Sequence, residues 1–171
     1  VTRHVSLPVC IYDNPGTSHF VFSDALHARI ATLPHIASIK IPGVPAAIAA
    51  ATQRVNALRD QLPQDVTIGV SGDAFAAAGL IAGCEVWYSV CGGLFPHTAK
   101  AMTDAAMAGD FAAVAEQEQR LAPLWALFTQ HGGSIRVIAA AASALGLAEY
   151  DCLPRQLRSL SAADVVEVKR V

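Results

Sequence analysis

The feature that most constrains the fold is a fourfold alternation of strand patterns with helix patterns. Short runs of nearly continuous apolar residues lie at 7–12, 35–41, 66–70 and 85–90. Each run is followed by a turn signal and then by a segment with helical character. Strands that alternate with helices form parallel sheets, and strands that are apolar throughout are buried on both faces. The sequence therefore predicts an α/β fold.

Capping and terminating residues predict where the helices between these strands begin and end. Ser23 can cap a helix that runs to about Leu33, where Pro34 ends it. Further helices are expected at 45–62, 74–82 and 96–107. Apolar residues at steps of three and four predict one buried face for each of the first two helices. These inward positions are Leu26, Ile30 and Leu33, and then Ile48, Ala51, Val55, Leu58 and Leu62.

Beyond residue 108 the pattern is helical only. A long helix at 110–130 contains Pro123, where we expect a kink. A second helix is expected at 134–145, and a last one begins at Ser161, which with Asp164 resembles a capping box. We therefore divide the chain into an α/β part, residues 1–108, and a helical extension, residues 109–171.

Two architectures fit four strand–helix units. One is an open, doubly wound parallel sheet, and the other is part of a (β/α)8 barrel. A complete barrel needs about 250 residues. A chain of 171 residues would supply four of its eight strands. Both arrangements place a ligand at the carboxyl ends of the strands.

The composition of the chain limits the classes of molecule to which it is expected to bind. The net charge is −2 and no basic run is present, which disfavours nucleic acid. No apolar stretch approaches the ~20 residues of a membrane span, so no membrane partner is expected. Charged residues make up only 15% of the chain, against about 25% in typical domains. We therefore expect apolar surface that faces further protein, as in a homo-oligomer.

The four cysteines and the N-terminal residues indicate the cellular compartment of the protein. Cys10, Cys84, Cys91 and Cys152 show no CxxC spacing, and three of them lie in or beside apolar segments. The chain begins without a basic and apolar leader. We interpret the cysteines as reduced core thiols of a cytoplasmic protein.

Lys40 is the most informative single residue, because it lies almost at the end of the apolar strand 35–41. Burial disfavours the ammonium form of a lysine, and a neutral amine is a nucleophile towards carbonyl carbon. The alternative is a structural lysine whose ammonium reaches water past the strand end. The residue alone leaves both interpretations open.

The other strand ends carry a phenol and small polar groups. They are Tyr12, Ser71 with Asp73, and Tyr88-Ser89. The six histidines are scattered without metal spacing, and HExxH, GxGxxG and Walker patterns are absent. We therefore predict neither a metal nor another cofactor.

Tyr12 has a coherent chemical task beside Lys40. An amine can condense with a ketone to a Schiff base, and the adjacent carbon then becomes an enamine nucleophile. A phenol on a neighbouring strand, about 4.8 Å away, can relay the protons of these steps. Alternatively, Tyr12 is an ordinary strand-end tyrosine with a solvated hydroxyl group.

These residues resemble the dihydrodipicolinate synthase / N-acetylneuraminate lyase family. Residues 11–17 resemble its YNxPxxT loop, and residues 37–40 resemble its GIK strand, with 28 positions from Tyr12 to Lys40. Residues 71–73, 88–96 and 107–111 resemble its SGDD turn, its ISVxxNxxP segment and the link into its long C-terminal helix. The resemblance covers essentially the whole chain.

The resemblance implies a class I aldolase or lyase on a (β/α)8 TIM barrel, with residues 1–108 as βα units 5–8 and 109–171 as the C-terminal helices. It implies Lys40 as the Schiff-base lysine and Tyr12 as the proton relay. Tyr88, Ser89, Ser71 and Thr17 are the implied substrate-binding residues. Pyruvate or a related 2-keto acid and an aldehyde are the implied substrates, in a homo-oligomer that is a dimer or a tetramer.

The chain departs from the family pattern in three respects. The half of the family fold that carries a Gly-Thr-Thr-Gly-Glu carboxylate loop has no counterpart in residues 1–171. Thr17 stands where dihydrodipicolinate synthases have an arginine for the second substrate's carboxylate. Tyr88 replaces a smaller aliphatic residue and should narrow the pocket. These departures indicate a different acceptor aldehyde. The competing hypothesis is a non-catalytic fragment, or a half-barrel interaction module.

Overall fold

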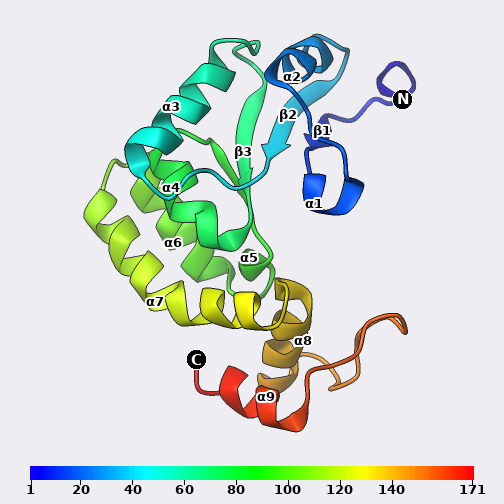
Figure 1. Ribbon diagram of the computed structural model, residues 1–171, viewed down its shortest axis with the longest axis vertical. Helices are drawn as coiled ribbons and strands as arrows, with labels where there is room; N and C mark the ends of the chain where they lie inside the picture. Colours follow the sequence, from blue (N-terminus) through cyan, green and yellow to red (C-terminus); the bar gives the residue numbers. More distant parts are fainter.

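The computed structural model describes residues 1–171, and its centre is a four-stranded parallel sheet (Figure 1). Its strands are β1 (Val9–Tyr12), β2 (Ile36–Ile41), β3 (Thr67–Ser71) and β4 (Val86–Tyr88). They lie in the order β1-β2-β3-β4, which is also their order in the chain. A doubly wound sheet reverses its strand order at a switch point, whereas a barrel adds each strand beside the last. The structure is therefore half of a (β/α)8 barrel.

Nine α-helices and two 3-10 turns complete the chain. They are η1 (Thr2–His4), α1 (Pro15–Ser18), α2 (Asp24–Ala31), α3 (Ile48–Arg59), η2 (Asp73–Phe75), α4 (Ala76–Ile81), α5 (Cys91–Leu94), α6 (Pro96–Met107), α7 (Phe111–Gln130), α8 (Ser134–Ala144) and α9 (Ala162–Val168). The expected strands and helices are present, with ends shifted by a few residues. The sequence did not predict η1, α1 or α5.

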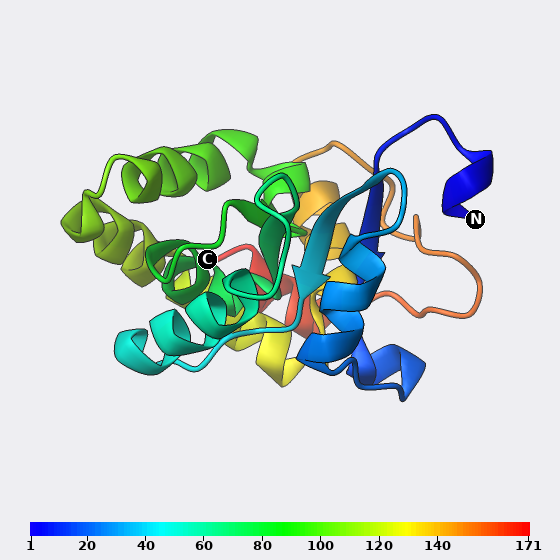
Figure 2. The same cartoon turned by 90° about the horizontal axis from the view of Figure 1, so that it is seen from above.

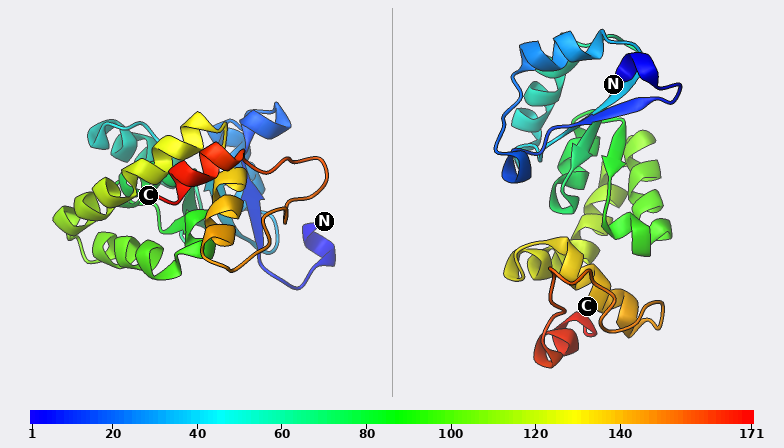
Figure 3. Two further views of the ribbon diagram at one scale, coloured as in Figure 1. Left: turned by 90° about the horizontal axis from the view of Figure 1, so that it is seen from below. Right: turned by 90° about the vertical axis from the view of Figure 1, so that its right-hand side faces the viewer.

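The carboxyl ends of the strands face the turn between α7 and α8 (Figure 1). Viewed from its side, the molecule is elongated, with the sheet and its first helices at one end and α8 and α9 at the other (Figure 3). The 3-10 turn η1 projects beside β1 (Figure 2). The helices α7 and α8 thus lie across the edge of the sheet where a barrel places its ligand.

A first hydrophobic core joins the outer face of the sheet to α2 and α3. It contains Ile39 and Ile68 from the strands and Val55 and Leu58 from α3, each at most 2% exposed. Fully burying one such side chain stabilises a fold by about 1.5–3 kcal/mol. This core therefore fixes β2 and β3, and with them the position of Lys40.

A second core joins α4, α5 and α6 to the C-terminal helices. Met102 of α6, Val114 of α7, Val137 of α8 and Leu160 are each at most 1% exposed within it. The division between residues 108 and 109 stays a prediction, and apolar side chains pack continuously across it.

Two predicted inward faces differ in the structure. In α2 the buried residues are His27 and Ala31, and Leu33 lies beyond the helix and is 43% exposed. In α3 the predicted Ala51, Val55 and Leu58 are buried, but Ile48 at its first turn is 42% exposed. Periodicity gives the spacing of a helical stripe, whereas the neighbouring elements decide which stripe is covered.

The predicted helix ends are largely observed. The Ser23 hydroxyl accepts the Leu26 amide hydrogen at 3.2 Å and begins α2. The carboxylate of Asp110 accepts the Ala113 amide hydrogen at 3.0 Å and begins α7, which continues through Pro123. Ser161 and Asp164 form the predicted capping box of α9. These caps satisfy amide groups that a helix leaves unpaired at its start.

All four cysteines are free, as predicted, but only two belong to a core. Burial raises the pKa of the Cys84 thiol to about 12 and that of Cys91 to about 11. Cys10 and Cys152 are exposed, so the expectation of core thiols is wrong for them. Cys10 is exposed because its side chain lies on the inner face of the half-barrel, beside Tyr88, and no core covers that face. None of the helices is long and apolar enough to cross a membrane.

Candidate active site

The sheet brings Tyr12 and Lys40 together at its carboxyl edge. The two residues are register partners on β1 and β2. The Lys40 Nζ lies 3.8 Å from the centroid of the Tyr12 ring and 5.4 Å from that of the Tyr88 ring. Aromatic faces attract a cation at such distances. The amine therefore has a defined position between two phenol rings.

A glycine makes room for the second of these rings. Gly69 on β3 lies beside Lys40 in the register, and a Cβ atom there would come within 2.3 Å of the Tyr88 ring. The ring thus lies against bare backbone. The Tyr88 hydroxyl donates a hydrogen bond of 2.8 Å to Ser38 Oγ, and the Thr67 hydroxyl donates another of 2.8 Å to the same atom.

Burial favours the neutral form of the Tyr88 phenol. Burial raises the pKa of Tyr88 most, and the nearby Cys10 thiol acts in the same direction, while the hydrogen bond to Ser38 acts against them. A neutral phenol can donate to Ser38. The Tyr88 ring is thereby anchored and forms a wall beside the Lys40 amine.

Tyr12 is placed less tightly than Tyr88. Its hydroxyl lies 3.5 Å from Ser71 Oγ, the limit of a hydrogen bond, and the residue is 50% exposed. Lys40 is only partly buried. The burial that would make the amine a nucleophile is therefore incomplete within residues 1–171, because β1 and β4 each have a neighbouring strand on one side only.

The two remaining predicted site residues make local hydrogen bonds. Thr17 lies in α1 and is exposed, and its hydroxyl oxygen accepts a hydrogen bond of 3.0 Å from Asn14 Nδ2. The Ser89 hydroxyl oxygen accepts the Gly92 amide hydrogen at 2.7 Å. These contacts shape the loops after β1 and β4. Of the six predicted residues, Tyr12, Lys40, Ser71 and Tyr88 form one connected group.

Asp73 supports this group, although the sequence interpretation gave it no role. The residue is 5% exposed. Its carboxylate accepts hydrogen bonds from Trp87 Nε1 at 3.0 Å, from the Val90 amide at 3.1 Å and from the Cys91 amide at 2.8 Å. The carboxylate thus ties the end of β3 to the loop after β4, which follows Tyr88. The available signal in the sequence was an acidic residue two positions beyond the end of β3.

We expect Asp73→Ala to lower the free energy of unfolding by about 3 kcal/mol, because one buried and two partly buried donors lose their acceptor. Urea unfolding followed by circular dichroism measures this change. Asp65→Ala is the matched control, since Asp65 is exposed, and it should change stability by less than about 0.5 kcal/mol. Equal stability of the two variants would contradict the anchoring role of Asp73.

A buried histidine and carboxylate lie behind the loop that follows Tyr12. His27 is 0% exposed and Asp13 is 4% exposed, and His27 Nε2 lies 3.4 Å from Asp13 Oδ2. The imidazole stacks on Phe22, with ring centroids 5.1 Å apart. Burial lowers the pKa of His27 most, although Asp13 and Asp24 act in the opposite direction. The pair was not predicted from the sequence, because His27 lies in α2 and Asp13 in the loop after β1.

The lowered pKa of His27 predicts a loss of stability in acid. Below the ordinary value of 6.5, the unfolded chain binds a proton that the folded chain resists, so acidification favours unfolding. The stability that depends on a neutral His27 is fully present above this value and decreases as the pH falls through it. We expect His27→Leu to weaken the loss of stability between pH 7 and pH 5, measured by urea unfolding. An unchanged pH dependence would contradict this assignment.

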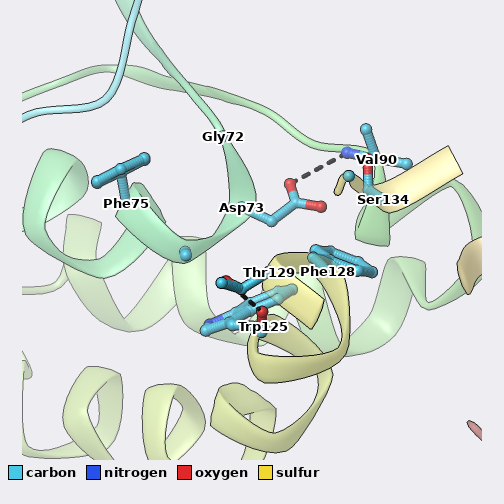
Figure 4. Close-up of a pocket in the computed structure, with 10 residues that line it drawn as sticks. Gly72, Asp73, Phe75, Val90, Trp125, Phe128, Thr129 and Ser134 are labelled. Atoms are coloured by element: carbon cyan, nitrogen blue, oxygen red, sulfur yellow. Dashed lines mark hydrogen bonds between the residues drawn. The ribbon is translucent and has the colours of Figure 1, made fainter. Parts of the chain in front are cut away.

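A cavity of about 290 Å³ lies between the strand ends and the C-terminal helices. Figure 4 shows Gly72, Asp73, Phe75 and Val90 on the sheet side, and Trp125, Phe128, Thr129 and Ser134 on the helix side. It begins at Gly72, next to Ser71. None of Tyr12, Lys40, Ser71 and Tyr88 lines the cavity itself, so the loop after β3 is the link between the cavity and their group.

A separate cluster of possible metal ligands lies where the C-terminal end of α7 meets α9. One ligand atom each of His131, Asp164 and Glu167 lies within 4.8 Å of the others. Asp164 already caps α9, and Glu167 accepts a hydrogen bond from Gln130 Nε2 at 2.9 Å. Structural hydrogen bonds thus account for both carboxylates.

The family model of the dihydrodipicolinate synthetase family matches residues 1–169. The chain belongs to this family. Its members are lyases, and the half-barrel observed here is part of their (β/α)8 fold. The resemblance inferred from the sequence motifs is thereby confirmed.

Two sequence relatives support membership of the dihydrodipicolinate synthetase family. A 4-hydroxy-tetrahydrodipicolinate synthase of Rickettsia typhi is 31% identical over 130 residues, which are 73% of this chain and 41% of that protein. The enzyme of the same name from Rickettsia rickettsii is 28% identical over 149 residues, which are 87% of this chain and 48% of that protein.

Solved structures of the dihydrodipicolinate synthetase family agree as well. The dihydrodipicolinate synthase of Agrobacterium tumefaciens is 40% identical, with a TM-score of 0.89 over 97% of this chain and 55% of that chain. The enzyme of Thermotoga maritima has a TM-score of 0.86 at 20% identity, and shares the fold. The chain thus spans about half the length of the relatives that it matches.

Proposed function

We propose that this chain provides the Schiff-base half of an aldolase or lyase that acts on pyruvate or a related 2-keto acid. The observation that carries the proposal is the contact of the Lys40 amine with the Tyr12 ring, on paired strands at the carboxyl edge of a half-barrel. In (β/α)8 enzymes the chemistry lies at this edge. Family membership adds that relatives of this chain are lyases.

The reaction begins at the amine of Lys40. Its Nζ attacks the keto carbon, and water leaves as the Schiff base forms. Loss of a proton from the neighbouring carbon gives an enamine, which attacks an aldehyde carbon and forms the new carbon–carbon bond. The aldehyde oxygen takes a proton, and water then hydrolyses the Schiff base and frees Lys40. The same steps in reverse cleave a 4-hydroxy-2-keto acid.

Tyr12 serves as the proton relay in these steps, and the other strand-end residues shape the site. The Tyr12 hydroxyl has Ser71 Oγ as its neighbour at 3.5 Å, so a proton can be passed on. Tyr88 and the loop at Ser89 form the wall beside the amine. Thr17 carries no charge, which favours a second substrate other than that of the Rickettsia synthases. The homo-oligomer and the cytoplasmic location stay predictions.

Trapping with borohydride tests the proposal. The native gene product that carries residues 1–171 is incubated with pyruvate, reduced with sodium borohydride, digested and analysed by mass spectrometry. We expect a reduced pyruvate adduct on the peptide that contains Lys40. An unmodified Lys40 peptide at saturating pyruvate would refute the assignment.

A second candidate function, a binding module without catalysis, is favoured by the open edges of β1 and β4. Unpaired strand edges invite association with another chain. Residues 1–171 expressed by themselves are expected to aggregate and to be inert towards pyruvate. A stable monomer in sedimentation experiments would contradict the expected aggregation.

A further inference from the structure

We infer that the second substrate is an uncharged, apolar aldehyde with an aromatic or similarly flat group, and that it binds in the cavity between the strand ends and α7. This inference rests on the proposed function, since it names the acceptor for the enamine formed on Lys40.

The cavity wall and the proposed reaction site share the chain segment at the end of β3. Gly72, in its wall, follows Ser71, whose Oγ lies 3.5 Å from the Tyr12 hydroxyl. The Phe75 ring, another part of the wall, lies against Gly43, where a Cβ atom would come within 2.3 Å of it. Gly43 is three residues beyond Lys40. The cavity wall is thus built on the segments that follow β2 and β3.

Apolar and aromatic side chains form most of the lining. Trp125 and Phe128 of α7 have ring centroids 5.5 Å apart with their planes at 44°, and Phe75 and Val90 lie across the cavity from them (Figure 4). Such rings offer faces and edges to a flat aromatic ligand. The volume of about 290 Å³ is at the small end for ligand pockets, so the fit is to a small aldehyde.

No cation lines the cavity. None of its ten residues is lysine, arginine or histidine. Its one charged group, the Asp73 carboxylate, already accepts three hydrogen bonds and would repel an anion. A carboxylate buried there would lose its hydration without gaining a partner. Thr129 and Ser134 supply hydroxyl groups, which suit an uncharged oxygen.

Matched aldehydes test the inference on the native gene product. Benzaldehyde is compared with 4-carboxybenzaldehyde, and butanal with 4-oxobutanoate, each with pyruvate, and the aldol product is measured by chromatography and mass spectrometry. We expect a kcat/KM at least tenfold greater for the uncharged member of each pair, and the greatest value for benzaldehyde. Equal rates within the pairs, or a preference for the anion, would overturn the inference.

A charge placed in the cavity should reverse this preference. Thr129 is exposed at the rim, so Thr129→Arg adds a guanidinium there without disturbing a core. It should raise the relative kcat/KM for the anionic aldehydes at least tenfold. Ala126→Arg adds the same charge to an exposed position of α7 outside the cavity, and should leave the ratio unchanged. An equal ratio in both variants would count against the cavity as the acceptor site.

Borohydride trapping distinguishes failure of the acceptor inference from failure of the proposed function. If a pyruvate adduct forms on Lys40 but the aldehyde preferences are not as expected, the acceptor inference fails and the proposed function stands. If no adduct forms, the proposed function fails and the inference fails with it.

Discussion

Replacement of Lys40 by arginine is expected to abolish the pyruvate adduct and to lower kcat by at least about 10³-fold, which corresponds to about 4 kcal/mol of activation free energy. Arginine keeps the positive charge beside the Tyr12 and Tyr88 rings. A guanidinium stays protonated, however, and cannot act as the nucleophile. Stability should change little, so the loss of activity isolates the amine chemistry.

The matched control for this variant is Lys100→Arg. Lys100 is exposed on α6, where it pairs with Asp104 one turn away. Its replacement should leave both the adduct and kcat unchanged. If Lys40→Arg kept substantial activity, or if the adduct formed equally on another lysine, Lys40 would be a structural lysine at a strand end. That is the alternative that the sequence left open.

Replacement of Tyr12 by phenylalanine is expected to lower kcat by about 10²–10⁴-fold, the usual contribution of a general acid–base group. The ring remains beside Lys40, so only the hydroxyl is lost. That hydroxyl has one neighbour, Ser71 Oγ at 3.5 Å, and the residue is half exposed. The variant should therefore keep its stability and still yield the borohydride adduct, although more slowly.

Tyr150→Phe is the control for Tyr12→Phe. The Tyr150 hydroxyl donates a hydrogen bond of 2.6 Å to the Leu160 carbonyl oxygen, away from the strand ends. Its loss should lower stability by about 1 kcal/mol and leave kcat unchanged. If Tyr12→Phe had the same kcat as the parent protein, the proton relay would have to be sought elsewhere.

The sequence predicted the elements well because their signals are local. Four apolar runs, each followed by a helical pattern, were sufficient for the four strands and their helices. The caps at Ser23, Asp110 and Ser161 were found because a capping side chain bonds within three residues of itself. The motifs around Tyr12 and Lys40 identified the family for the same reason.

The sequence predicted most of the buried face of α3 but not that of α2, and it did not predict how Asp73 and Tyr88 are held. On α2 the buried residue is His27 rather than Leu26, because His27 packs against Asp13 and Phe22. Both of these residues lie outside the helix. Tyr88 reaches Ser38, fifty positions away in the chain, over the bare backbone of Gly69. Such contacts depend on strand register, which local patterns do not contain.

The sequence by itself determined the order of strands and helices and the family, because periodicity, caps and motif spacing act over short distances along the chain. Only the tertiary structure decided that the strands lie in the order β1-β2-β3-β4, with the Lys40 amine against the Tyr12 ring and an apolar cavity beyond Ser71. The physical reason is that strand pairing and core packing join residues far apart in the chain.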